Sequence, residues 1–322
     1  MTATTTQNAV FAQRFEELVS NVAKVIHGKD DVIRQAVECM MVEGHLLVED
    51  VPGTGKTSLV RALAASVAVT WNRVQFTPDL LPSDITGVTV FDQSTSEFSF
   101  RPGPVFANIV IGDEINRASP KTQSALLEVM EERTVTTDAS VYPVPRPFMV
   151  VATQNPIDME GTYQLPEAQL DRFLMRIAIG YPDAEHEAMV LRTQRDGPTV
   201  DQLHHVMTGD DLLRMTEFIK TIVVSPAIEQ YVVEIVSRTR DMPEIRLGVS
   251  PRGGLALVRA ARAHAAASGR SFVLPEDVKS VAEPVLSHRL VLHPEAELQG
   301  RTNTEMISRV LGSVPVPRSV TA

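Results

Sequence analysis

A glycine-rich turn between an apolar segment and a lysine is the first place where this chain could do chemistry. Residues 45–48 are predicted to form a short strand, and Lys56 and Thr57 open a helix after the turn. Closely spaced backbone N–H groups and the positive end of a helix bind phosphate. In such a loop the lysine reaches the β- and γ-phosphates, and the threonine hydroxyl ligates Mg²⁺. The candidate nucleotide-binding residues of this loop are Pro52, Gly53, Thr54, Gly55, Lys56, Thr57 and Ser58.

This loop departs from the usual pattern, which begins with glycine six positions before the lysine, because Asp50 stands there. Taken alone, the segment could be an ordinary strand, turn and helix with a surface lysine. A second segment favours the nucleotide site, since Asp113 and Glu114 directly follow the apolar residues 109–112. A carboxylate at the end of a buried strand can hold Mg²⁺ through its water shell, and the next carboxylate can polarise an attacking water. We therefore predict Asp113 as the metal-side carboxylate and Glu114 as the catalytic one; the alternative is an acidic flank of the following helix.

Three further polar residues are candidates, each with a simpler explanation beside the functional one. Asn155 ends the next predicted strand, where it could orient water, or it could be a turn residue before Pro156. Arg172 could reach the nucleotide of a neighbouring subunit, or it could be a solvated charge or a partner of Asp171. Arg252 stands at a helix start, where a cation opposes the helix dipole, so it requires a phosphate or a salt bridge.

Composition limits the class of protein. The chain has 322 residues, of which 43% are apolar and 22% are charged, as expected for a globular protein with one large or two smaller domains. The net charge of −10 argues against a general nucleic-acid binder. The single cysteine, Cys39, excludes an internal disulfide and a cysteine-based zinc site. With no run of about 18 apolar residues and no signal segment, the sequence favours the cytoplasm.

Apolar periodicity divides the chain into two parts. Strands alternate with helices up to residue 182, which predicts an α/β core with a parallel sheet. Two polar-tipped segments, 87–101 and 134–147, are predicted to form hairpins. Helices dominate afterwards, and three of them begin with proline. We predict a core over 1–182, with residues 1–9 frayed, a helical domain over 183–313, and a tail over 314–322.

Taken together, these residues resemble the MoxR family of AAA+ ATPases over nearly the whole chain. The resemblance rests on the order and wording of several blocks rather than on any single motif. These blocks are residues 49–57 (EDVPGTGKT), 113–128 (DEINRASPKTQSALLE), 152–156 (ATQNP), 161–173 (GTYQLPEAQLDRF) and 250–252 (SPR).

The resemblance implies a fold and a role for each matching position. It implies a five-stranded αβα P-loop core followed by an all-helical lid, with the 87–101 hairpin as an insert and the 134–147 hairpin before a sensor strand. It places Asp113 and Glu114 in the Walker B motif, and Asp50 also occurs in this family. The remaining implied roles are sensor 1 for Asn155, arginine finger for Arg172, sensor 2 for Arg252, and adenine contact for Ile26 and Gly28, next to His27.

The resemblance also implies an activity and partners. MoxR proteins look like ATP-driven chaperones that form rings, often hexamers. They remodel, assemble or insert metal into partner proteins, which often carry a von Willebrand factor A domain. ATP and Mg²⁺ are the implied cofactors. The alternatives are the ATPase subunit of a magnesium-chelatase-like complex, a nucleic-acid motor or restriction-type GTPase, and a nucleotide-gated module with almost no turnover.

Overall fold

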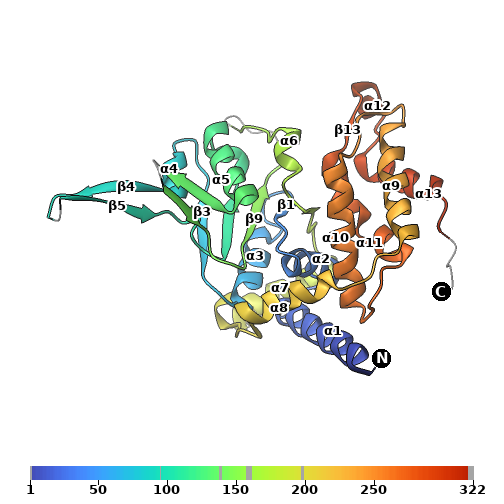
Figure 1. Ribbon diagram of the computed structural model, residues 1–322, viewed down its shortest axis with the longest axis horizontal. Coiled ribbons are helices and arrows are strands. Elements are labelled where there is room, and N and C mark those ends of the chain that lie inside the picture. Colours follow the sequence, from blue (N-terminus) through green and yellow to red (C-terminus); the bar gives the residue numbers. More distant parts are fainter. Residues whose placement is uncertain (1, 95, 138–139, 157–161, 197–198, 318–322) are drawn as a thin grey trace.

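The computed structural model describes residues 2–94, 96–137, 140–156, 162–196 and 199–317. A sheet of five parallel strands lies at its centre, in the order β10-β1-β9-β6-β3 (Figure 1). The strands are β1 (Leu46–Glu49), β3 (Trp71–Gln75), β6 (Ile109–Asp113), β9 (Met149–Gln154) and β10 (Met175–Ile177). The predicted five-stranded parallel sheet is therefore confirmed.

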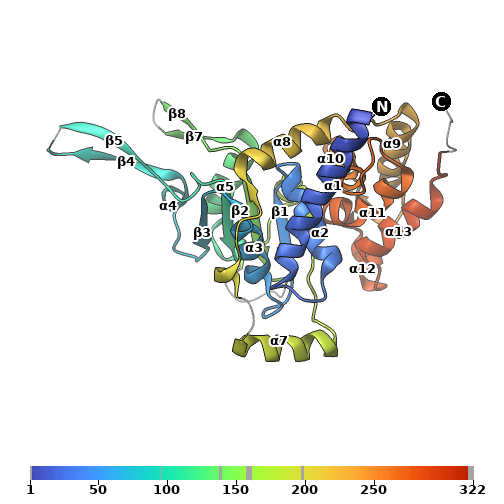
Figure 2. The ribbon, with the colours of Figure 1, turned by 90° about the horizontal axis from the view of Figure 1, so that it is seen from below.

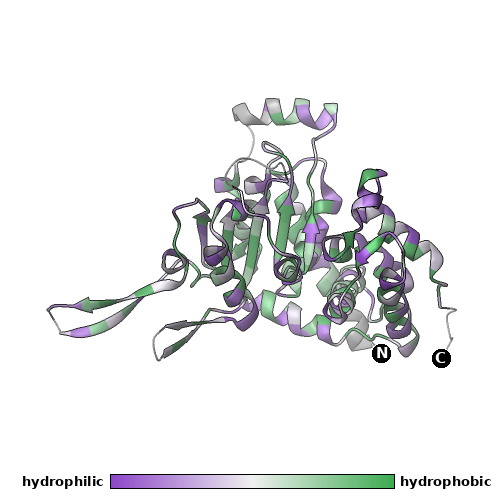
Figure 3. Ribbon diagram, turned by 90° about the horizontal axis from the view of Figure 1, so that it is seen from above, coloured by the Kyte–Doolittle hydropathy of each residue, from purple (hydrophilic) through white to green (hydrophobic). Residues whose placement is uncertain are grey.

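Helices cover both faces of this sheet, which explains why its strands are almost uniformly apolar (Figure 3). Successive residues of a strand point to opposite faces. Leu46 and Val48 accordingly pack into the apolar cluster that contains the first three helices, whereas Leu47 packs into the cluster that contains α5. These helices are α1 (Thr2–Ala23), α2 (Asp30–Met41), α3 (Lys56–Ala65) and α5 (Pro120–Glu132). The prediction of a frayed start was wrong, because α1 begins at Thr2 and buries Phe11 and Phe15.

A group of helices follows the sheet along the chain. These are α7 (Ala184–Asp196), α8 (Gly209–Lys220), α9 (Pro226–Arg240), α10 (Pro251–Ala267), α11 (Pro275–Leu286), α12 (Pro294–Leu298) and α13 (Asn303–Ser313). The predicted proline starts are confirmed, since Ser225 and Ser250 cap α9 and α10 ahead of a proline. Figure 2 shows α7 standing apart from the other helices.

The helical group is joined closely to the sheet. The long helix α10 packs against α1 and α2 as well as against α11, and one apolar cluster runs through all of them. The strand β11 (Met207–Thr208) also pairs with β2 (Val67–Ala68). The predicted boundary after residue 182 stays a prediction. Within the predicted tail, Val314 is buried, and residues 318–322 lie outside the described ranges.

Two hairpins project from the core on the side opposite α9, α11 and α13 (Figure 2). The first pairs β4 (Gly87–Asp92) with β5 (Glu97–Pro102), and the second pairs β7 (Thr134–Thr137) with β8 (Ser140–Pro143). Both predicted hairpins are confirmed. Phe91 and Phe98 on the first hairpin are exposed, and their ring centroids lie 5.0 Å apart.

Short elements complete the fold. These are the helices α4 (Pro82–Thr86) and α6 (Glu167–Leu170) and the paired strands β12 (Ile245–Leu247) and β13 (Val291–Leu292). Among the described residues, no helix is long and apolar enough to span a membrane.

Candidate active site

The predicted phosphate loop connects the end of β1 to the start of α3. Gly53 and Gly55 have φ angles of +87° and +90°, in the left-handed region that favours glycine. A Cβ atom added at either position would meet nothing within 4 Å, so the loop faces open space. Because α3 begins at Lys56, its first N–H groups lack helical partners and are available to an anion. The exposed residues Pro52 and Ser58 border this loop.

Lys56 and Asp50 hold the loop in its shape. The Nζ of Lys56 donates to the carbonyl oxygens of Asp50 and Val51, the latter at 3.0 Å, and the hydroxyl of Thr54 donates to the same Val51 oxygen at 3.1 Å. The Asp50 carboxylate accepts from the backbone N–H of Val51 at 2.7 Å and of Gly180 at 2.5 Å. Asp50 therefore ties the loop to the segment after β10, a role that its replacement of the usual glycine did not reveal.

The electrostatics of Lys56 reflect its position among acidic groups. Partial burial lowers the pKa of Lys56, while the carboxylates of Asp50, Glu114 and Asp113 act in the opposite direction. A phosphate placed on the loop would supply a stronger anionic partner than the two carbonyl oxygens that Lys56 now contacts.

Asp113, at the end of β6, lies beside Thr57. The Thr57 Oγ1 lies 3.4 Å from each carboxylate oxygen of Asp113, which is buried. Thr153 donates to Oδ1 at 2.9 Å, and Arg73 donates to Oδ2 at 2.7 Å. The parallel pairing of β3, β6 and β9 produces this convergence, because the carboxyl ends of parallel strands meet at one edge of the sheet.

Glu114 follows in a left-handed backbone conformation, with φ of +55°. Such an angle is uncommon for a residue with a side chain and is often found at functional sites. The Glu114 N–H donates to Thr153 Oγ1 at 2.9 Å, and its carboxylate accepts from Gln75 at 3.1 Å and Arg117 at 2.8 Å. Sequence reasoning missed Arg73, Gln75 and Arg117, although the alternation of Arg73 and Gln75 at the end of a strand is a signal that could have found two of them.

The remaining nucleotide candidates lie on the same side of the sheet. Asn155 immediately follows β9, and its carbonyl oxygen accepts from Asn116 at 3.1 Å. Ile26 is buried, and Gly28 has a φ of +67° with the His186 ring so close that an added Cβ would lie 2.5 Å from it. The turn at Gly28 therefore packs against His186. This histidine follows Gly180, whose N–H donates to Asp50 in the phosphate loop.

Arg172 and Arg252 lie away from the phosphate loop and form ion pairs with the same carboxylate. Each donates to one oxygen of Glu131 at 2.9 Å. Glu131 is near the end of α5, and the neighbouring Met130 oxygen lies 3.0 Å from Nε2 of His45, which directly precedes β1. The phosphate loop follows the opposite end of β1, and a four-residue strand spans about 13 Å. The structure thus brings Arg172 and Arg252 together, but at the amino ends of the parallel strands, whereas Lys56 lies at their carboxyl ends.

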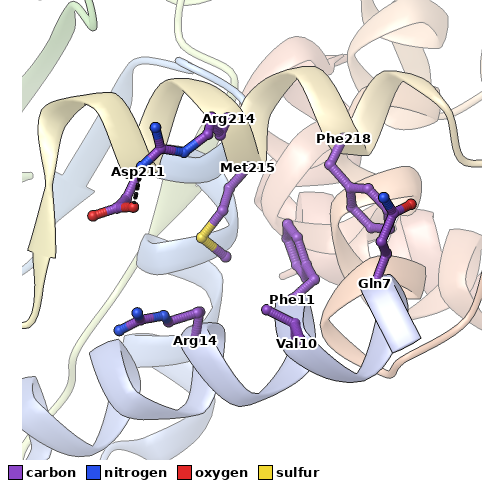
Figure 4. A pocket seen from close by; sticks show the side chains of 8 residues that line it. All are labelled: Gln7, Val10, Phe11, Arg14, Asp211, Arg214, Met215 and Phe218. Atoms are coloured by element: carbon purple, nitrogen blue, oxygen red, sulfur yellow. Dashed lines mark hydrogen bonds and ion pairs between the residues drawn. The ribbon is translucent and has the colours of Figure 1, made fainter. Parts of the chain in front are cut away.

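Two other features do not belong to this site. A cavity of about 650 Å³ lies between α1 and α8. Its apolar walls come from Val10, Phe11, Met215 and Phe218 (Figure 4). It contains none of the predicted site residues. Burial raises the pKa of Cys39, as expected for a structural thiol. Among the described residues, no group of three or more His, Cys, Asp or Glu side chains could hold a metal ion.

Comparison with known proteins agrees with this geometry. The family model described as "ATPase family associated with various cellular activities (AAA)" matches residues 45–175, and an AAA lid domain model matches residues 237–310. YeaC from Bacillus subtilis is 46% identical over 299 residues, which cover 93% of each chain. Chaperone MoxR1 from Mycobacterium tuberculosis is 42% identical over 312 residues, covering 94% of this chain and 82% of the relative.

A solved structure of a protein from Cytophaga hutchinsonii, assigned as an ATPase, has a TM-score of 0.89 and 38% sequence identity and covers 97% of each chain. Sheet, phosphate loop and lid together define an AAA+ ATPase, which binds a nucleotide and hydrolyses ATP to ADP and phosphate. Within that class, the chain belongs to the MoxR family.

Proposed function

We propose that the chain binds Mg²⁺-ATP on the loop 50–58 and hydrolyses it with Glu114 as the group that activates water. Lys56 and the α3 N-terminus would bind the phosphates, with Ile26 and Gly28 beside adenine. The hydroxyl of Thr57 and the carboxylate of Asp113 are oxygen donors of the kind that Mg²⁺ prefers, and their proximity supports this assignment. When bound, Mg²⁺ neutralises charge that develops on the transferred phosphoryl group.

The chain's own residues would then position water and proton. Gln75 and Arg117 both donate to Oε2 of Glu114, which orients the carboxylate and leaves Oε1 as the oxygen that would accept the proton from water. Asn155, one residue beyond β9, would orient the water as a neutral amide. The hydrogen bond from the Glu114 backbone N–H to the Thr153 hydroxyl keeps these two strand ends together.

The separation of two arginines from Lys56 is the observation that supports a site shared between subunits. Arg172 and Arg252 lie at the opposite edge of the sheet and share Glu131. This separation supports a role for the two arginines at the nucleotide site of another subunit. We therefore propose a head-to-tail homo-oligomeric ring, a hexamer, in which Arg172 acts as the finger in the neighbouring site and Arg252 assists it.

We further propose that hydrolysis serves a chaperone function on a client protein with a von Willebrand factor A domain. A relative named Chaperone MoxR1, which matches over 94% of this chain, supports the chaperone function. The projecting hairpins, with exposed Phe91 and Phe98, offer a surface that could contact such a client. The acidic net charge disfavours the alternative of a nucleic-acid motor.

Capture of partners from a native lysate tests this function. Glu114→Gln protein in Mg²⁺-ATP is the bait, and Lys56→Ala, which should not bind nucleotide on the phosphate loop, is the matched control. We expect proteins retained only by Glu114→Gln, among them one with a von Willebrand factor A domain. Retention of magnesium-chelatase subunits or DNA instead would contradict the proposal.

A further inference from the structure

A second cationic cavity lies away from the phosphate loop. It occupies about 390 Å³ at the junction of α8, α10 and the base of the β7–β8 hairpin. We call it the arginine cavity. The charged side chains that line it are Glu43, Arg133, Arg146, Lys220, Arg259 and Arg262. Five cations thus face a single carboxylate in a chain whose net charge is −10.

The single carboxylate is already occupied. Glu43 is buried and accepts from Arg133 at 2.9 Å and from Arg146 at 2.5 Å. These bonds use only part of the donor capacity of each guanidinium, which carries five N–H groups. Lys220 pairs with Glu217 at 2.6 Å, but that pair is exposed on both sides and therefore easily exchanged.

Arg259 and Arg262 lack a carboxylate partner among the described residues. They lie three positions apart on α10 and so share one face of the helix. Arg259 donates to the carbonyl oxygen of Val42 at 2.6 Å. The Nε of Arg262 is buried and has no hydrogen-bond partner in the described part of the chain. Buried donors are normally satisfied, so this atom indicates a missing acceptor.

We propose that the arginine cavity binds a phosphate group, supplied either by free pyrophosphate or by a nucleotide. Planar guanidinium groups bind phosphate through two parallel hydrogen bonds, and several of them converge here. The cavity volume is within the range of small-molecule sites. This site is separate from the phosphate loop. Neither Arg172 nor Arg252 lines it, although Arg133, Arg259 and Arg262 also line an adjoining cavity of about 500 Å³ that contains both. A bound phosphate would join α8 and α10 to the hairpin base.

Calorimetric titration of the full chain with pyrophosphate tests the proposal. The titrations use the Lys56→Ala background at low ionic strength, so that the phosphate loop does not contribute. We expect one equivalent to bind, and Arg259→Gln or Arg262→Gln to weaken binding at least tenfold. Arg262→Lys keeps the charge but loses the two parallel hydrogen bonds of the guanidinium, so it should also weaken pyrophosphate binding. Arg238→Gln, an exposed arginine on α9, is the matched control and should leave binding unchanged.

A second arm identifies the source of the phosphate, and circular dichroism verifies that every variant is folded. Tighter binding of ATP than of pyrophosphate in the Lys56→Ala background assigns the site to a nucleotide, and the reverse order assigns it to free phosphate. The proposal is overturned if Lys56→Ala protein binds neither anion, or if Arg259→Gln and Arg262→Gln bind as tightly as Arg238→Gln. Tighter binding of hexaglutamate, with displacement of pyrophosphate, would overturn it in favour of an acidic peptide.

Discussion

Replacement of Glu43 by glutamine should destabilise the protein strongly, because it removes a buried charge on which two arginines depend. The Glu43 side chain is 5% exposed, and its partners Arg133 and Arg146 are 33% and 53% exposed. Removing one member of a buried ion pair costs about 3–5 kcal/mol. Since both arginines are partly solvated, we expect the lower end, about 3 kcal/mol.

Thermal and urea unfolding, followed by circular dichroism, measure this loss. A loss of that size should lower the Tm by roughly 4 °C in a chain of this length. The matched control is Glu217→Gln, which removes a carboxylate from a pair exposed by 59% on both sides and should change stability by less than about 0.5 kcal/mol. A Glu43→Gln protein within about 1 kcal/mol of the unchanged chain would refute this reasoning.

The same variant has a pH signature. Burial raises the pKa of Glu43, but the hydrogen bonds and charges of Arg146 and Arg133 outweigh it and hold the pKa below the ordinary value of 4.5. Because the folded-state pKa is depressed, the stabilisation is present above pH 4.5 and is lost as the pH falls through the folded-state pKa. The stability difference between the two proteins should therefore shrink as the pH falls below 4.5.

Three further predictions concern nucleotide and pH. In an Arg262→Gln background, which weakens the proposed arginine-cavity site, Lys56→Ala should abolish binding of a fluorescent ATP analogue, and retained affinity would contradict the loop assignment. Glu114→Gln should bind ATP but lose turnover by about 10²–10⁴-fold in a phosphate-release assay, and full turnover would exclude its role as general base. The hydrogen bond that the His264 ring donates to the Glu38 carboxylate raises the pKa of His264 above 6.5. The stabilisation from this bond is therefore present below pH 6.5 and is lost as the pH rises through the raised value. The urea stability difference between the unchanged chain and His264→Gln should accordingly shrink between pH 6 and 9, and a constant difference would exclude this linkage.

The elements that sequence predicted well are those fixed by local pattern. The apolar strands before Asp50 and Asp113, the glycine turn, and the Ser-Pro helix starts all carry their signal within a few residues. Their parallel pairing then places Thr57 and Asp113 together without further information.

The elements that sequence did not resolve depend on distant packing. The spacing of Arg252 gives its place on α10 but not which edge of the sheet α10 meets, so its partner Glu131 was not predicted. Asp50 reaches Gly180, 130 positions away, and no local pattern encodes that contact. The pairing of Arg133 and Arg146 with Glu43 likewise needed the three-dimensional arrangement.

We propose that each active site is shared by two subunits, and mixing two inactive variants tests this sharing. Lys56→Ala lacks a working phosphate loop but keeps Arg172, and Arg172→Ala has the opposite defect. In an equal mixture of freely exchanging subunits, about one interface in four combines an intact loop with an intact arginine. We expect that neither variant alone hydrolyses ATP and that the mixture regains about one quarter of the wild-type turnover. A mixture no more active than the two variants measured separately would contradict the account.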